Sequence, residues 1–194
     1  MIDEKILIIT SNDQYGDVIF KKYRHHDEVL VIFHDISSLA RIRRLLSGEK
    51  ITIRFLLKTF WCRLRIMKIF RKSLTFSDIT QIESFLESYC ISNVIMFRCG
   101  IILPTRFIDK YRSINIHAAN LPEFSGLGSI LRALDAGAYN QCVTVHYASS
   151  SIDAGKIIFQ VPYKLDPRLS YCANEDQAYR TGLRALDLTI QSLI

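Results

Sequence analysis

An asparagine and a histidine on one strand, with an aspartate further along the chain, are the side chains best suited to chemistry. Asn115 and His117 lie in the segment Ser-Ile-Asn-Ile-His, which is typical of a β-strand. Side chains two positions apart on a strand project from the same face, so we expect the amide and the imidazole side by side. Asp153 lies in a loop of small residues, and Gly155 just after it permits close backbone approach.

These three functional groups together suit acyl transfer to an amine. An asparagine amide can donate to the oxyanion of a tetrahedral intermediate, which is typically worth about 2.7–4 kcal/mol. A histidine moves protons near neutral pH, and a carboxylate orients it or raises its pKa. No serine or cysteine stands in a nucleophile setting such as GxSxG, so direct attack by the acceptor is favoured over a covalent enzyme. Taken singly, each residue has an ordinary structural interpretation as a satisfied strand histidine or a turn aspartate.

The elements that must position these residues follow from the apolar pattern. Short apolar runs predict strands buried on both faces at 5–10, 28–33 and 93–97. Further strands are expected at 113–117, 142–147 and 156–160, and helical spacing favours helices at 14–26, 35–48, 75–90 and about 129–136. This alternation predicts an α/β fold with a mostly parallel open sheet flanked by helices. We find no linker or internal repeat, so residues 1–194 are expected to form a single domain.

Ligands of such sheets sit beyond the carboxyl ends of the strands. The loops after Ile9, Phe33 and Phe97 are therefore expected to line a site, together with the segment after His117. The first loop is not a GxGxxG fingerprint, so dinucleotide binding is disfavoured.

Composition excludes several classes of protein. Of 194 residues, 49% are hydrophobic and 23% charged, which is close to the globular average and excludes a disordered or low-complexity chain. No window offers the roughly 20 nearly uncharged apolar residues of a membrane span, and the N-terminus is not a secretory signal. The five cysteines include no CxxC pair, which indicates reduced thiols and neither a disulfide framework nor a zinc site. We therefore expect a cytoplasmic protein.

Positive charge is concentrated in one segment. Residues 41–72 hold eleven basic side chains against one acid, Glu49, interleaved with aromatic and aliphatic residues. Such a stretch is typical of contact with an anionic membrane, a nucleic acid or a phosphorylated substrate. It is equally typical of a helical layer whose basic side chains extend from a packed face. We expect much of it to be buried against the sheet or a second subunit, and keep a homodimer and peripheral membrane contact through 50–72 as hypotheses.

From Met96 to Gln160 the sequence resembles the folate-dependent formyltransferases, which include glycinamide ribonucleotide, methionyl-tRNA and nucleotide-sugar N-formyltransferases. The matching pieces agree with this family in their order and spacing as well as in residue identity. These pieces are Gly100-Ile-Ile-Leu-Pro104, Asn115-Ile-His117, Leu121-Pro122 with Gly126, Ala133-Leu-Asp-Ala-Gly137, Val143-Thr-Val-His146 and Ile152-Asp-Ala-Gly155.

The resemblance implies a Rossmann-like formyltransferase fold, 10-formyltetrahydrofolate as the formyl donor, no metal, and Asn115, His117 and Asp153 as a catalytic trio. The sequence departs from the usual pattern of the family at two places. Ala118 follows the histidine where proline is common, and serines stand where an acidic residue usually precedes the aspartate. The pterin-binding loops implied by the resemblance comprise Phe97, Arg98, Cys99, Gly100 and Ile101 in one loop, and Ser149, Ser150, Ser151 and Ile152 in the other.

The first loop bears on the identity of the amine. It lacks the glycines with which glycinamide ribonucleotide formyltransferases hold a phosphate through backbone N–H groups, and its Asp13 and Asp17 are expected to repel phosphate. Methionyl-tRNA formyltransferases carry a further C-terminal domain of the OB type, and no such domain is expected in the sequence up to Ile194. Nucleic acid is therefore a weaker alternative, kept open by the basic segment.

The acceptor favoured by exclusion is a small-molecule amine, namely a nucleotide-linked amino sugar used for a surface polysaccharide. We expect it to contact Ser11, Asn12, Ser125 and Gly126. A non-catalytic binding relative that retains the trio as structure is the alternative from a different functional class.

Overall fold

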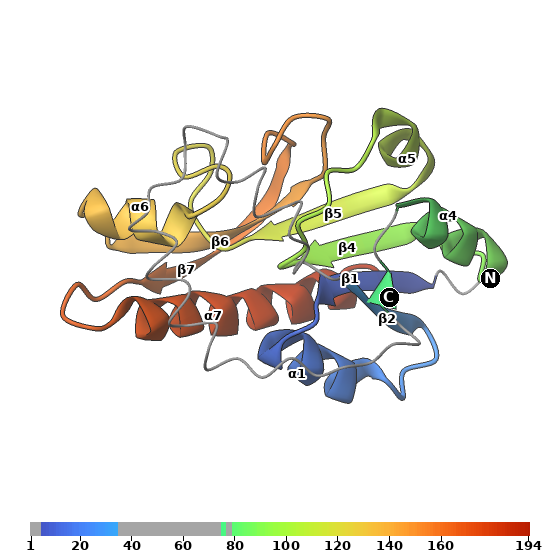
Figure 1. The fold of residues 1–194 in the computed structure, drawn as a ribbon, viewed down its shortest axis with the longest axis horizontal. Coiled ribbons are helices and arrows are strands. Elements are labelled where there is room, and N and C mark those ends of the chain that lie inside the picture. The colour runs from blue at the N-terminus through green and yellow to red at the C-terminus, as the bar shows by residue number, and fades with distance from the viewer. Residues whose placement is uncertain (1–4, 35–74, 77–78) are drawn as a thin grey trace.

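The computed structural model describes residues 5–34, 75–76 and 79–194. The helix expected at 35–48 and the basic segment 41–72 lie outside the described residues. Within the described ranges the strands form one seven-stranded sheet in the order β3-β2-β1-β4-β5-β6-β7 (Figure 1). These strands are β1 Ile6–Ser11, β2 Val29–His34, β3 Thr75–Phe76, β4 Asn93–Phe97, β5 Arg112–His117, β6 Asn140–Tyr147 and β7 Ile157–Lys164. The helices are α1 Gln14–Tyr23, α4 Ile79–Ser88, α5 Thr105–Lys110, α6 Ser129–Asp135 and α7 Tyr171–Gln191.

The prediction of a mostly parallel sheet flanked by helices is confirmed. Strands β3, β2, β1, β4 and β5 are paired in parallel, whereas β6 and β7 add to the sheet in antiparallel fashion. The predicted helix over 75–90 is shorter at its start, because Thr75 and Phe76 pair with the end of β2. The strand predicted at 156–160 extends to Lys164, because it pairs along the whole of β6.

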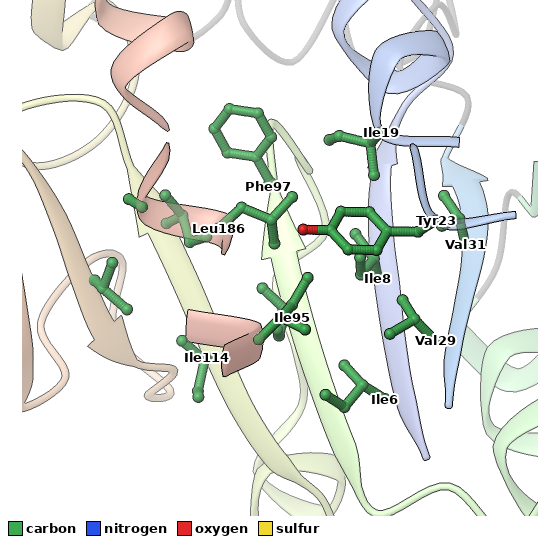
Figure 2. Close-up of a cluster of buried hydrophobic side chains, with 14 of the residues drawn as sticks. Ile6, Ile8, Ile19, Tyr23, Val29, Val31, Ile95, Phe97, Ile114 and Leu186 are labelled. Carbon is green, nitrogen blue, oxygen red and sulfur yellow. The ribbon is translucent and has the colours of Figure 1, made fainter. Parts of the chain in front are cut away.

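Two apolar layers hold the helices against the sheet. On one face, Ile8 of β1 and Ile95 of β4 pack against Ile19 of α1 and Leu186 of α7 (Figure 2). On the opposite face, alternate residues of the same strands pack against α4 and α5. Figure 1 shows this division, with α1 and α7 below the sheet and α4 and α5 above it. Strands β1 and β4 are therefore buried on both faces, which explains their uninterrupted apolar sequences.

The C-terminal half of α7 approaches β4 so closely that one position must be glycine. A Cβ atom at Gly182 would lie 2.5 Å from Cε2 and 2.7 Å from Cζ of Phe97, whose ring is fully buried. We expect Gly182→Ala to lower the free energy of unfolding by about 1–3 kcal/mol, because overpacking displaces a core ring. Urea unfolding measures the change, with Gln191→Ala on the exposed side of α7 as control. An unchanged unfolding midpoint would mean that α7 shifts without cost.

The cysteine interpretation is wrong at one position. Cys172, in the first turn of α7, forms a disulfide, so it is not a reduced thiol. Cys90, Cys99 and Cys142 form no disulfide, as expected. The absence of a CxxC pair could not exclude a disulfide between cysteines far apart in sequence. Among the described helices, none has both the length and the apolar character needed to cross a membrane.

Candidate active site

The three residues singled out from the sequence meet at the carboxyl end of β5. The carboxylate of Asp153 accepts a hydrogen bond from Asn115 Nδ2 at 3.1 Å through one oxygen, Oδ1. Its other oxygen, Oδ2, lies 3.2 Å from Nδ1 of His117. The side chains of His117 and Asp153 are only about one tenth exposed. One carboxylate thus joins the amide and the imidazole, as the strand spacing predicts for the first two residues.

A second histidine belongs to the cluster and was given no role from the sequence. Nε2 of His146 lies 3.1 Å from Nδ2 of Asn115 and 3.7 Å from Oδ1 of Asp153. Its Nδ1 lies 2.8 Å from the Tyr147 carbonyl, an acceptor, so Nδ1 carries the proton and Nε2 accepts from the amide. The pairing of β6 with β5 sets Asn115 opposite His146. The signal in the sequence that could have identified His146 is its place in Val143-Thr-Val-His146, one of the pieces that resemble the formyltransferases.

The loop after β6 holds Asp153 in an unusual backbone conformation. Asp153 has φ 51°, in the left-handed region that aspartate tolerates better than most residues. The Gly126 N–H donates to its Oδ2 at 2.7 Å, which ties the loop after β5 to the loop after β6. Gly155 lies so close to the end of β6 that a Cβ atom would be 1.7 Å from the Tyr147 carbonyl oxygen. The expectation that Gly155 allows close approach is confirmed.

Burial and neighbouring charges determine the protonation of the pair. Burial acts to raise the pKa of Asp153, but the His146 ring, the charge of His117 and the Gly126 N–H together lower it to about 2. Burial lowers the pKa of His117 below its ordinary 6.5, and Asp153 and the Phe124 carbonyl offset part of that effect. Asp153 is therefore a carboxylate and His117 a neutral imidazole near pH 7. The site contains a base next to a fixed negative charge.

The two loops assigned to the pterin contact the same apolar layer of the core. Cys99 and Ile101, after β4, pack against the same apolar cluster as Ala148, after β6. Ser149 donates from its hydroxyl to the Ser151 carbonyl at 2.8 Å, so part of the serine run is held by its own hydrogen bonds. The cofactor role of Phe97, Gly100, Ser150 and Ile152 stays a prediction.

The residues assigned to the acceptor are divided between two places. Gly126 belongs to the cluster through its bond to Asp153, and the carbonyl of Ser125 accepts from the Arg132 guanidinium. Ser11 and Asn12 lie at the end of β1, where Ser11 donates to Asp13 at 2.8 Å. No hydrogen bond joins this first loop to the trio within the described residues.

The two aspartates that are expected to repel phosphate are both ion-paired. Asp13 forms an ion pair with Arg98 at 2.6 Å, and Asp17 forms one with Lys21 at 2.7 Å. Both charges are therefore compensated. The resemblance assigns Arg98 to the pterin loop through its backbone, and no pattern in the sequence indicates that its side chain reaches the first loop.

Comparison with known proteins places this cluster in a family. Residues 68–183, more than half of the chain, match the family described as formyl transferase. The chain belongs to the formyl transferase family. A phosphoribosylglycinamide formyltransferase of Haemophilus influenzae is 28% identical over 104 residues, covering 53% of this chain and 48% of the relative. A methionyl-tRNA formyltransferase of Blochmanniella floridana is 32% identical over 122 residues, covering 61% of this chain and 38% of the relative.

Solved structures agree with the fold of this formyl transferase. A phosphoribosylglycinamide formyltransferase from Streptococcus pneumoniae superposes with a TM-score of 0.64 at 21% identity, covering 98% of each chain. A candidate sugar N-formyltransferase from Mycobacterium tuberculosis gives 0.62 at 17% identity, covering 95% of this chain and 66% of that one. The chain spans about half or less of the length of the curated relatives that it matches.

Proposed function

We propose that this formyl transferase moves a formyl group from 10-formyltetrahydrofolate to a primary amine of a nucleotide-linked amino sugar. The observation that carries the proposal is the single carboxylate of Asp153, which contacts both Asn115 and His117 at the carboxyl end of the sheet. An amide donor and a neutral base held by one buried anion are what acyl transfer to an amine requires. Membership of the formyl transferase family indicates that the transferred group is a formyl group.

The chemistry is a direct displacement at the formyl carbon. The acceptor nitrogen forms a bond to this carbon, whose carbonyl oxygen becomes an oxyanion that Asn115 stabilises by donating an N–H. His117 takes the proton that the amine nitrogen loses on Nε2, which has to leave the Phe124 carbonyl that lies 2.9 Å away, and Asp153 stabilises the resulting imidazolium through Nδ1. The bond from the formyl carbon to N10 of the donor then breaks, and the proton passes from His117 to that nitrogen. Both N–H groups of Asn115 already face acceptors, so the oxyanion has to replace Asp153 or His146 as one partner.

Apolar side chains near the cluster support the assignment of an aromatic donor. Ile102, Leu127 and Ile152 are each more than half exposed, and all three lie in loops that flank the trio. The loops of Leu127 and Ile152 are adjacent, because a Cβ atom at Gly126 would lie 4.0 Å from Cγ2 of Ile152. Exposed apolar side chains beside a polar site favour a ligand that has apolar surface as well as polar groups.

The identity of the amine is tested directly by a panel of acceptors. The full chain is incubated with 10-formyltetrahydrofolate and, separately, amino-sugar nucleotides, glycinamide ribonucleotide or methionyl-tRNA. We expect a mass gain of one formyl group on an amino-sugar nucleotide. Formylation of only one of the other two acceptors would overturn the amino-sugar assignment. No product from any acceptor, together with no binding of a folate analogue in calorimetry, would instead indicate a non-catalytic relative.

The burial of His117 predicts the pH range of the base. Because the pKa of His117 lies below 6.5, the imidazole is neutral at pH 7 and gains its proton only as the pH falls through this lowered value. Asp153 opposes the lowering, so Asp153→Asn is expected to lower the pKa of His117 further. NMR titration of the imidazole in both proteins measures the two values. A wild-type value above 6.5, or a higher value in the variant, would contradict the burial argument.

A further inference from the structure

The backbone of residues 124–126, in the loop after β5, contacts both titratable members of the trio. The carbonyl oxygen of Phe124 lies 2.9 Å from Nε2 of His117. Two residues later, the Gly126 N–H donates to Oδ2 of Asp153 at 2.7 Å. Main-chain groups of one short segment therefore hold the base and the anion of the proposed reaction.

The two groups that face the His117 imidazole match its protonated form. Nδ1 lies 3.2 Å from Oδ2 of Asp153, and Nε2 lies 2.9 Å from the Phe124 carbonyl oxygen. Both partners are acceptors, and only an imidazolium carries an N–H on each of its ring nitrogens. In the proposed reaction the imidazolium exists only after the amine has lost its proton. A contact that is stronger at this stage than in the free enzyme lowers the barrier.

The local sequence does not by itself fix the conformation of the 124–126 segment. Gly126 has φ 78° and Gly128 has φ 70°, both in the left-handed region. Glycine is free to leave this region, because it has no Cβ atom. The segment lies between the end of β5 and the start of α6, outside both elements. A contact from elsewhere in the protein is therefore needed to keep it in one conformation.

Arg132 of α6 supplies such a contact at the middle of the segment. Its Nη2 donates to the carbonyl of Ser125, the residue between the two main-chain groups that face the trio. The helix that carries Arg132 is itself anchored. Ile130 and Ala133 are buried in one apolar cluster with Ala178 of α7. The guanidinium thus joins the segment to a helix that is packed against the body of the protein.

We infer that Arg132 is a positioning residue of the formyl transfer. By holding the Ser125 carbonyl, it keeps the two neighbouring main-chain groups on the imidazole and the carboxylate of the trio. Arg132 acts through this backbone and not on the reacting atoms. Its role in the reaction rests on the proposed function, whereas its hold on the segment does not.

The charge of Arg132 has a second effect, which the test has to separate from the first. Burial lowers the pKa of His117 most, and the charge of Arg132 adds a smaller lowering. Loss of this charge therefore raises the pKa, whereas loss of the Phe124 carbonyl lowers it. Because these effects oppose each other, the pKa of His117 does not report on the segment. Hydrogen exchange of the Gly126 amide does, because its bond to Asp153 is made by the segment itself.

The test compares Arg132→Met with Arg132→Lys in the full chain. Methionine removes the charge and the donor, whereas lysine keeps a charged donor for the Ser125 carbonyl. Arg132 is exposed on α6, and methionine is a good helix former, so both variants are expected to fold. Amide exchange is followed by NMR, and formyl transfer by steady-state kinetics.

The exchange measurement reports on the segment alone. In Arg132→Met we expect the Gly126 amide hydrogen to exchange about tenfold faster, because a hydrogen bond from a charged donor to the segment is lost. In Arg132→Lys the rate is expected to stay close to that of wild type. The reference is the amide of Ala138, which donates to the Ala133 carbonyl at 2.9 Å at the end of α6. Its exchange is expected to be unchanged in both variants.

The kinetic measurement links the segment to the reaction. In Arg132→Met we expect kcat to fall by about 10–100-fold, the effect of a small misplacement of reacting groups. The KM of the donor is expected to stay within about threefold, because the imidazolium forms only after the substrates have bound. Arg132→Lys is expected to restore most of kcat. The matched control is Arg184→Met, which removes an exposed arginine of α7 and is expected to retain wild-type exchange and kcat.

Several results would overturn the inference. Wild-type exchange of the Gly126 amide in Arg132→Met would show that Arg132 does not hold the segment. Faster exchange of Gly126 and Ala138 alike would indicate a general loosening of α6. Faster exchange at Gly126 with unchanged kcat would remove the positioning role. A loss of kcat in Arg132→Lys as large as in Arg132→Met, with Gly126 still protected, would show that the guanidinium acts elsewhere. Absence of formyl transfer in wild type, with the expected exchange result, would count against the proposed function alone.

Discussion

Replacement of Asn115 by alanine is expected to lower kcat/KM for formyl transfer by about 10²–10³-fold, the usual effect of losing one donor to an oxyanion. The Asn115 amide donates to the carboxylate that also contacts the His117 imidazole. The truncation leaves His117 and Asp153 in contact, so the base is retained and only the stabilisation of the oxyanion is removed. The loss should appear in kcat rather than in KM, because the oxyanion exists only in the transition state and intermediate.

The control for this variant is an asparagine outside the cluster. Asn140 is exposed at the first position of β6, and Asn140→Ala is expected to retain wild-type kcat/KM. Circular dichroism and thermal unfolding of both variants establish that the fold is intact. His117→Ala is measured alongside. Retention of more than a tenth of wild-type kcat/KM in both Asn115→Ala and His117→Ala would rule out the catalytic assignment.

The parts of the fold that could be predicted are those whose local pattern has one interpretation. The runs at β1, β2 and β4 are continuous and apolar because both faces of these strands are covered. The strand that carries Asn115 and His117 could be predicted for a related reason, since its buried isoleucines alternate with polar residues. In each case the environment of the strand is visible in its own sequence.

The parts that could not be predicted depend on partners far along the chain. Strand β3 has only two residues and exists because it pairs with β2. His146 becomes a member of the site through an antiparallel register, which no local pattern specifies. Arg98 and Asp13 are 85 positions apart, so their ion pair cannot be predicted from the local sequence. Local periodicity cannot show which side chains neutralise each other.

Replacement of Asp153 by asparagine is the change expected to have the largest effect on the trio as a unit. Both carboxylate oxygens act as acceptors, Oδ1 for Asn115 and Oδ2 for the Gly126 N–H and for His117. An amide has one oxygen and one NH2 group, so whichever way it turns, a donor faces a donor. Asparagine tolerates the left-handed backbone at this position about as well as aspartate. The defect is therefore in the hydrogen bonds and the charge.

We expect Asp153→Asn to lower kcat by about 10²–10⁴-fold, the range for loss of a functioning acid–base pair. The imidazolium loses the anion that stabilises it, and Asn115 loses the acceptor that orients its amide. The matched control is Asp109→Asn, which removes an exposed carboxylate at the end of α5 and is expected to retain wild-type activity. Steady-state kinetics at saturating donor measures kcat, and a folate analogue measures binding separately. A fall confined to the affinity for the analogue, with kcat retained, would assign Asp153 to the donor site and remove it from the proton transfer.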